Sequence, residues 1–201
     1  MPTLVLVRHG VSTWNLENRF TGWVDVPLAP AGETEAREAG RHLRRLGMTY
    51  DIAFTSALQR ARRTLEIMLE EMSASIPIHA LPDLNERHYG ELQGLLKSDM
   101  VARYGAEQVH RWRRSYAERP PGGESLADTA VRVLRCYHHD IVPALRAHPT
   151  TIVVAHGNTI RGLVMHLETI SPEDIPNREI PFGVPIVYEL DDALTIISQS
   201  T

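Results

Sequence analysis

Two stretches of the chain share one pattern: residues 3–10 read TLVLVRHG and residues 151–157 read TIVVAHG. Each is a short apolar run, rich in β-branched residues, that ends in a histidine followed by a glycine. Continuous apolar runs of this length are typical of strands that are buried on both faces, as in a parallel sheet covered by helices. We therefore predict two strands of one sheet, with His9 and His156 directly beyond their ends.

The segments around these strands alternate between extended and helical patterns. We predict further strands at residues 52–54 and 76–80, and helices at residues 30–46, 57–72, 97–116 and 159–167. Ser125 opens a variant of the capping box ahead of a long helix whose apolar positions keep helical spacing as far as Leu145. This alternation predicts an α/β fold, with a three-layer, open and mostly parallel sheet flanked by helices.

Length and composition favour one globular domain. The 201 residues are 43% hydrophobic and 23% charged, without an internal repeat or a low-complexity tract. We expect residues 1–201 to form a single domain, in which the polar and helical residues 84–124 form a cap over the site. In a sequence, the apolar residues of a dimer interface look the same as those of a core, so a homodimer stays open as an alternative.

Bulk charge and cysteine content exclude several classes of protein. Asp and Glu number 25 against 21 Lys and Arg, a net charge of -4, which does not favour nucleic acid or an anionic membrane as partner. The single cysteine, Cys136, excludes an internal disulfide. The apolar run at residues 4–7 is too short for a signal peptide or a membrane span, and we expect a cytoplasmic protein.

The two histidines suggest a shared binding site. Ligands of open α/β sheets bind beyond the carboxyl ends of the strands, where His9 and His156 are expected. A lone histidine at such a position is more often an ordinary loop residue, but Arg8 precedes His9, and small residues with little bulk follow it. The composition is that of a cradle for an anion, and its members are Gly10, Ser12, Asn15, Thr21 and Gly22.

Further arginines are expected at the same edge of the sheet. Arg60 follows a predicted strand-to-helix turn, a geometry suited to phosphate, whereas Arg62 and Arg63 fit a solvated helix face better. Residues 86–89 read ERHY, and residues 111–114 read RWRR. Charge clusters of this kind are usually solvated faces, unless an anion binds beneath them.

Several of these motifs together resemble a known family. The triplet at residues 8–10 (RHG), the segment at residues 85–90 (NERHYG), the segment at residues 112–114 (WRR) and residues 155–158 (AHGN) look like motifs of the cofactor-dependent phosphoglycerate mutases, within the histidine phosphatase superfamily. The triplet marks only the superfamily, whereas the second and third segments look like the substrate-gripping cap of the mutases. The match extends over nearly the whole chain and implies a phosphoglycerate mutase-like fold.

The resemblance implies a role for each matching position. His9 would be the nucleophile that becomes phosphorylated, and Glu86 the general acid and base for the substrate hydroxyl. Arg8, Arg60, His156, Asn15 and the Gly157 backbone would hold the transferring phosphoryl group. The positions that match binding residues for the rest of the glycerate are Ser12, Thr21, Gly22, Tyr89, Lys97, Arg113, Arg114 and Asn158.

The resemblance also implies the reaction and its cofactor. It predicts interconversion of 3-phosphoglycerate and 2-phosphoglycerate in glycolysis and gluconeogenesis, with 2,3-bisphosphoglycerate as the primer that charges His9 and with no metal. The partner is then a small anionic phosphorylated substrate. The histidines accordingly lack the helical spacing of a zinc site, since His138 and His139 are adjacent.

Some positions depart from the family pattern. Val11 stands where the family usually has Glu, Leu96 where it usually has Asn, and Thr159 where Ser is common. An insertion found in longer members before residue 123 is missing, and the tail to Thr201 is short. A short tail favours a site more open to water, and with it some phosphatase activity.

Two other functions compete with the mutase. A phosphomonoesterase would use the same phosphohistidine chemistry and pass the phosphoryl group to water. A non-enzymatic binding or interaction module would keep only the fold. The complete set of cap residues argues against the first, and the presence of Arg8, His9, Arg60, Glu86 and His156 argues against the second.

Overall fold

The computed structural model describes residues 1–201, and a six-stranded sheet runs through its middle. The strand order is β3-β2-β4-β1-β5-β6, in which the first four strands are parallel, β5 pairs antiparallel with β1, and β6 pairs antiparallel with β5. The bounds are β1 (Thr3–Arg8), β2 (Ile52–Thr55), β3 (Ile78–Ala80), β4 (Thr150–Ala155), β5 (Pro185–Leu190) and β6 (Ile196–Ser200). The predicted α/β fold with a mostly parallel sheet is confirmed.

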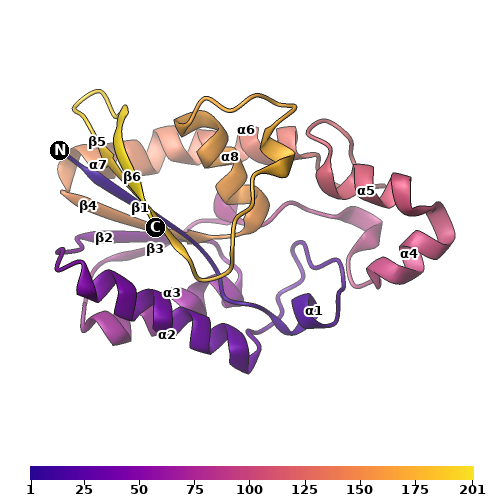
Figure 1. Ribbon diagram of the computed structural model, residues 1–201, viewed down its shortest axis with the longest axis horizontal. Coiled ribbons are helices and arrows are strands. Elements are labelled where there is room, and N and C mark those ends of the chain that lie inside the picture. The colour runs from indigo at the N-terminus through magenta and orange to yellow at the C-terminus, as the bar shows by residue number, and fades with distance from the viewer.

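Helices cover both faces of the sheet and make the three layers (Figure 1). One face carries α2 (Pro30–Arg45) and α3 (Gln59–Met72), and the other carries α6 (Leu126–Cys136), α7 (Val142–Ala147) and α8 (Gly157–Leu167). The strands β1 and β4 are buried on both sides because their alternate residues enter two separate apolar cores. Val5 and Val7 join the core under α2 and α3, while Leu4 and Leu6 join the one under α6 and α8.

Local sequence explains where the helices begin. Pro30 opens α2 at its first position, where the missing N–H costs no helical hydrogen bond. Ser125 caps α6 and completes a capping box with Asp128, as its position predicted. The long helix predicted beyond it is one helical rod in outline, but a π-helical turn at residues 137–141 separates α6 from α7.

Other predicted elements differ from the structure. The single helix predicted at residues 97–116 is two helices, α4 (Lys97–Tyr104) and α5 (Ala106–Arg114), because Gly105 adopts a φ of 83° that interrupts the helical hydrogen bonds. The strand predicted at residues 76–80 is shorter and exposed at the sheet edge. The short helix α1 (Thr13–Leu16) and the strands β5 and β6 were not predicted.

The helices α4 and α5 extend to one side of the layered body, beyond the carboxyl ends of β1 and β4 (Figure 1). They pack around a small apolar core of their own, which consists of Phe20, Leu92, Met100, Val109 and Trp112. This core is separate from the two cores under the sheet, and of residues 84–124 only Leu84 belongs to one of those two.

No helix of the structure is both long enough and apolar enough to cross a membrane.

Candidate active site

The two histidines meet at the carboxyl edge of the sheet. β1 and β4 pair in parallel with Arg8 opposite Ala155, which brings the next residues, His9 and His156, side by side. Their ring centroids are 4.9 Å apart in an edge-to-face arrangement. His9 lines a pocket, whereas His156 is fully buried behind it.

His9 is held as a neutral imidazole with one defined tautomer. Its Nδ1 lies 2.6 Å from the carbonyl oxygen of Gly10, which can only accept a hydrogen bond, so Nδ1 carries the proton and Nε2 keeps its lone pair. Burial, together with the positive charges of Arg60 and Arg8, lowers the pKa of His9 well below its usual value of 6.5. A neutral imidazole with a free Nε2 is a competent nucleophile.

His156 is also kept neutral. Burial lowers its pKa well below 6.5, and the charge of Arg60 adds to this effect. Its Nε2 lies 2.7 Å from the Ser56 hydroxyl, while its Nδ1 is buried without a partner in the protein. His156 thus packs against the His9 ring from behind and does not line the pocket.

Two arginines flank His9, of which Arg60 is buried and Arg8 is half-buried. Arg8 donates from one terminal nitrogen to the carbonyl oxygen of Ile180 at 2.8 Å, and its guanidinium carbon lies 3.6 Å from the centre of the Phe182 ring. Arg60 donates to the carbonyl oxygens of Gly22 and Val24 at 2.8 and 3.0 Å. Burial lowers the pKa of Arg60 to about 10, so it stays charged at neutral pH.

The pocket in front of His9 is strongly cationic. It is a cavity of about 130 Å³ that opens to solvent. Its acidic lining residues are Glu86 and Glu179. Its basic lining residues are Arg8, Arg19, Arg60, Lys97, Arg113, Arg114 and Arg161.

Most of these cations have no counterion in the protein. Arg19 pairs with Glu17 at 2.6 Å and Arg114 with Glu179 at 3.6 Å, but the other five have no carboxylate within ion-pairing distance. The Nε of Arg8 and the hydroxyl of Thr21 are in addition buried without a hydrogen-bond partner. Buried polar groups left unpaired are costly, so this pocket is suited to a ligand with several negative charges.

The loop after His9 contributes the predicted small residues. Asn15, Thr21 and Gly22 line the pocket. Ser12 does not: it is fully buried, its hydroxyl caps α1, and it donates to the Asn15 side-chain oxygen at 2.8 Å. Ser12 thus sets the orientation of the Asn15 amide.

Residues 84–124 supply the opposite wall. Glu86, Tyr89, Lys97, Arg113 and Arg114 all line the pocket, as do Gly157 and Asn158 at the start of α8. One oxygen of the Glu86 carboxylate accepts from the backbone N–H of Asn158 at 3.1 Å and from that of Arg87 at 2.8 Å. The bond from Asn158 ties the Glu86 carboxylate to α8, the helix that follows His156.

Lys97 is a weakened base in this wall. Its Nζ donates to the side-chain oxygen of Asn18 at 3.2 Å. Burial, followed by repulsion from Arg113, Arg8 and Arg114, lowers the pKa of Lys97 to about 8. Lys97 is therefore charged at neutral pH and loses its charge in mildly alkaline solution.

Sequence reasoning missed four lining residues: Arg19, Phe20, Arg161 and Glu179. Of the two arginines among them, Arg161 is the more deeply buried, and burial lowers its pKa to about 10. It lies one turn into the helix that follows His156, so its spacing from Gly157 was the available signal. Glu179 comes from a loop without helical or strand pattern, and no sequence signal placed it here.

The positions that depart from the family pattern lie outside the pocket lining. The backbone N–H of Val11 donates to Glu35 at 2.7 Å, and Leu96 precedes α4. The Thr159 hydroxyl donates to the carbonyl oxygen of Asn85 at 2.8 Å. Arg63 is partly exposed and pairs with Glu66, which confirms its assignment to a solvated face.

Comparison with known proteins defines the class. A profile of the histidine phosphatase superfamily (branch 1) matches residues 4–193. The chain therefore belongs to the histidine phosphatase superfamily. Among solved structures, Bacillus stearothermophilus YhfR has a TM-score of 0.84 at 27% identity, covering 98% of this chain and 94% of that one. A mycobacterial glucosyl-3-phosphoglycerate phosphatase has a TM-score of 0.76 at 26% identity, covering 94% and 93%.

Curated relatives narrow the class. A 2,3-bisphosphoglycerate-dependent phosphoglycerate mutase of Cytophaga hutchinsonii is 52% identical over 200 residues, covering 100% of this chain and 93% of that protein. A protein of the same name from Methylobacterium radiotolerans is 54% identical over 198 residues, covering 98% and 93%. The resemblance to the cofactor-dependent mutases that the motifs predicted is confirmed.

Proposed function

We propose that this protein is a 2,3-bisphosphoglycerate-dependent phosphoglycerate mutase, which interconverts 3-phosphoglycerate and 2-phosphoglycerate through a phosphohistidine. One observation carries the proposal: the neutral imidazole of His9 lies in a pocket with seven cationic side chains, five of which have no carboxylate partner. The named function of relatives about half identical to this chain supports it.

His9 performs the transfer. Its Nε2 attacks the phosphorus of the bound donor in line, an N–P bond forms, and the P–O bond to the leaving hydroxyl oxygen breaks. The transition state spreads charge over three equatorial oxygens, so catalysis consists mainly of positioning and electrostatic stabilisation. Arg8, Arg60 and the backbone of Gly157 are placed to stabilise that charge, and His156 keeps the His9 ring in position.

Glu86 moves the proton. It donates a proton to the oxygen that leaves phosphorus, and it takes a proton from the acceptor hydroxyl when the phosphoryl group returns from His9. The two hydrogen bonds that its carboxylate accepts from backbone N–H groups hold it at the pocket wall. This arrangement supports its role as the acid and base of both half-reactions.

The remaining charges of the substrate are held by residues of both walls. Lys97, Arg113 and Arg114 offer cations to the glycerate carboxylate and to the second phosphate. The uncharged contacts come from Asn15, Thr21, Gly22, Tyr89 and Asn158. We assign residues 84–124 of this single domain as the cap that grips the substrate.

The primer 2,3-bisphosphoglycerate fits the same pocket. It carries one more phosphate than the substrate, and the unpaired donors of Arg8 and Thr21 and the cations without counterions suit that charge. Bound there, it supplies the phosphoryl group that charges His9. The arginines take the part that a metal ion plays in other phosphoryl transferases, so we propose a reaction without metal.

The second candidate is a phosphomonoesterase. It is favoured by one observation, the similarity at 26% identity to a solved phosphatase of glucosyl-3-phosphoglycerate. In that case water would take the phosphoryl group from His9. The cations of the cap argue for the mutase, because a phosphoglycerate acceptor needs its own anion-binding groups and water needs none.

The test is an assay of purified, chelator-treated protein with 3-phosphoglycerate, with and without catalytic 2,3-bisphosphoglycerate, in which 2-phosphoglycerate and free phosphate are both measured. The mutase predicts primer-dependent isomerisation with little phosphate release. Phosphate release without isomerisation would establish the phosphatase. Isomerisation lost only after chelation would contradict a metal-free reaction.

A further inference from the structure

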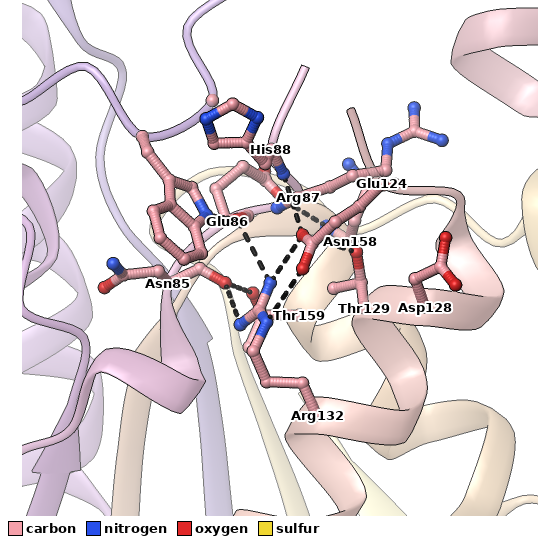
Figure 2. A network of polar contacts seen from close by, with 12 residues as sticks. Asn85, Glu86, Arg87, His88, Glu124, Asp128, Thr129, Arg132, Asn158 and Thr159 are labelled. Atoms are coloured by element: carbon pink, nitrogen blue, oxygen red, sulfur yellow. Dashed lines mark hydrogen bonds and ion pairs between the residues drawn. The ribbon is translucent and has the colours of Figure 1, made fainter. Parts of the chain in front are cut away.

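The guanidinium of Arg132, on α6, is the centre of a polar network outside the pocket (Figure 2). A guanidinium has five N–H donors, and all of them are used. Nε donates to Glu124 Oε1 at 3.1 Å, and the terminal nitrogens donate to Glu124 Oε2 at 2.8 Å and to the carbonyl oxygens of Asp83, Asn85 and Glu86 at 2.7, 3.0 and 3.3 Å. No donor is left for a ligand.

The partners of Arg132 lie on one short segment. Three of the five bonds go to backbone carbonyls of residues 83–86, the segment that carries the proposed acid and base. The indole N–H of Trp23 also donates to the carbonyl oxygen of Glu86, and the Arg132 guanidinium lies 5.5 Å from the Trp23 ring centre. One side chain of the layered body thereby holds the backbone beneath Glu86.

Glu124 also contacts the backbone that follows Glu86 in the chain. Its Oε2 also accepts from the backbone N–H of His88 at 2.9 Å and from the Thr129 hydroxyl at 3.3 Å. The ion pair is largely buried, with side-chain exposures of 12% for Arg132 and 23% for Glu124, so water competes little with it. Together the two side chains bracket residues 83–88.

The Glu86 carboxylate depends on this bracket for its place. Arg132 makes no bond to that carboxylate and does not line the pocket. The carboxylate bridges instead to the N–H of Asn158 on α8, a contact that holds only while the backbone of Glu86 keeps its distance from that helix. A displacement of about 1 Å at a catalytic group can cost on the order of 100-fold in rate.

We infer that Arg132, with Glu124 as its partner, is a positioning residue for the proton transfer of Glu86. The inference rests on the proposed function. Arg132 acts through the three carbonyls and sets where the carboxylate stands relative to the substrate hydroxyl, while the binding of substrate charges is left to other residues.

The test compares Arg132→Lys with a matched control on the same helix. Lysine keeps the charge but lacks the planar fork that reaches three carbonyls and a carboxylate at once. The control is Arg135→Lys: the exposed Arg135 contacts the same segment, but through the side-chain carboxylate of Asp83, at 2.8 Å, and not through its backbone. We expect a kcat reduced about 10- to 100-fold with an unchanged KM for Arg132→Lys, and unchanged values for the control.

A double-mutant cycle separates positioning from a general loss of structure. If Arg132 acts through Glu86, Arg132→Lys has little further effect on kcat once Glu86→Gln is present. If the two effects multiply, the inference is wrong. Glu124→Gln keeps the shape of the partner but removes its charge, and it should show a loss of kcat similar to that of Arg132→Lys. Thermal melting shows which of the two variants is folded, and the test uses a folded one.

The two proposals fail in different ways. A wild-type protein that does not isomerise 3-phosphoglycerate overturns the proposed function and the role of Arg132 together. A wild type that isomerises, while the folded Arg132→Lys variant keeps its kcat or loses only its KM, overturns the positioning role alone.

Discussion

The sheet edge and residues 84–124, the proposed cap, are held in the structure by different contacts. At the sheet edge, His9 and His156 follow two paired strands, are almost fully buried and are fixed by backbone register. Of residues 84–124, only Leu84 joins a core under the sheet, and four others pack with Phe20 in a small separate core. Polar contacts such as that between Glu86 and Asn158 also link this segment to the body. The proposed nucleophile is therefore built into the fold, whereas the proposed acid and base, Glu86, and the proposed charge-binding groups depend on how residues 84–124 are held.

This contrast matters for a transfer between two molecules. The nucleophile must stay in one place through both half-reactions, and a buried strand end gives it that stability. The groups around the glycerate must accommodate donor and acceptor in turn, and a segment with fewer apolar contacts is more free to adjust. Changes at the sheet edge should thus stop the chemistry, and changes in the cap should alter its rate or its substrate affinity.

The largest effect is expected at the sheet edge. His9→Ala removes the atom that accepts the phosphoryl group, so isomerisation should fall by at least about 10⁴-fold. Acid-labile phosphate on the protein should vanish with it, as measured by mass spectrometry of the peptide that contains residue 9. Retention of labelled protein in His9→Ala would assign the nucleophile to another residue.

The next effect is expected in the cap. Glu86→Gln keeps the hydrogen bond accepted from Asn158 but cannot exchange a proton, so kcat should fall by roughly 10² to 10⁴-fold. Binding of inorganic phosphate, followed by calorimetry, should stay close to that of the wild type because the arginines are unchanged. A full rate in Glu86→Gln would show that another group serves the hydroxyl.

Lys97 gives residues 84–124 a pH dependence near pH 8, where Arg60 at the sheet edge, with its pKa of about 10, is still charged. Its pKa, lowered to about 8, means that the ammonium is present below pH 8 and is lost as the pH rises through that value. Because an anion binds the charged form better, kcat/KM should drop above pH 8, to a plateau about 10- to 100-fold lower. Lys97→Met should start at the lower value and show no such drop; a variant that retains the alkaline drop would assign it to another group.

The smallest effect on catalysis is expected at the turn between α4 and α5. Gly105 has a φ of 83° with no atom near its Cβ position, so Gly105→Ala costs backbone strain alone, of about 1 to 3 kcal/mol. The strain falls on helices that carry Lys97 and Arg113, and KM should rise several-fold. Gly47→Ala, at a φ of 67° beyond α2, is the matched control in the layered body. Gly47→Ala should lower the Tm in a thermal melt without changing KM. Equal KM values for Gly105→Ala and Gly47→Ala would contradict the division between the layered body and residues 84–124.

The layered body was predictable from sequence because its signals are local. The apolar runs that end in His9 and His156 identify strands buried on both faces, and helical spacing identifies the layers around them. The strands β5 and β6 were not predicted. β6 is largely exposed, so its residues lack the continuous apolar run that marks β1 and β4. The break at Gly105 was missed because helical spacing continues across it, and only the backbone conformation reveals the turn.

The candidate site was predictable only in part. Motif resemblance pointed to residues on both walls of the pocket, but it did not distinguish those that line it from Ser12 and His156, which are buried behind the lining. Arg161 was missed because an arginine on a predicted helix looks the same whether it is buried or solvated. The contacts of Arg132 with three carbonyls likewise have no sequence signal, since a backbone acceptor leaves no trace in residue type.

The fate of the phosphoryl group on His9 distinguishes a mutase from a phosphatase in one experiment. Protein labelled from radioactive 2,3-bisphosphoglycerate, freed of excess donor, is mixed either with 3-phosphoglycerate or with buffer alone, and the label is followed over time. We expect label on His9 that moves rapidly to the added phosphoglycerate and only slowly to inorganic phosphate in buffer. Rapid release as inorganic phosphate, with or without the acceptor, would overturn the proposed mutase and identify a phosphatase.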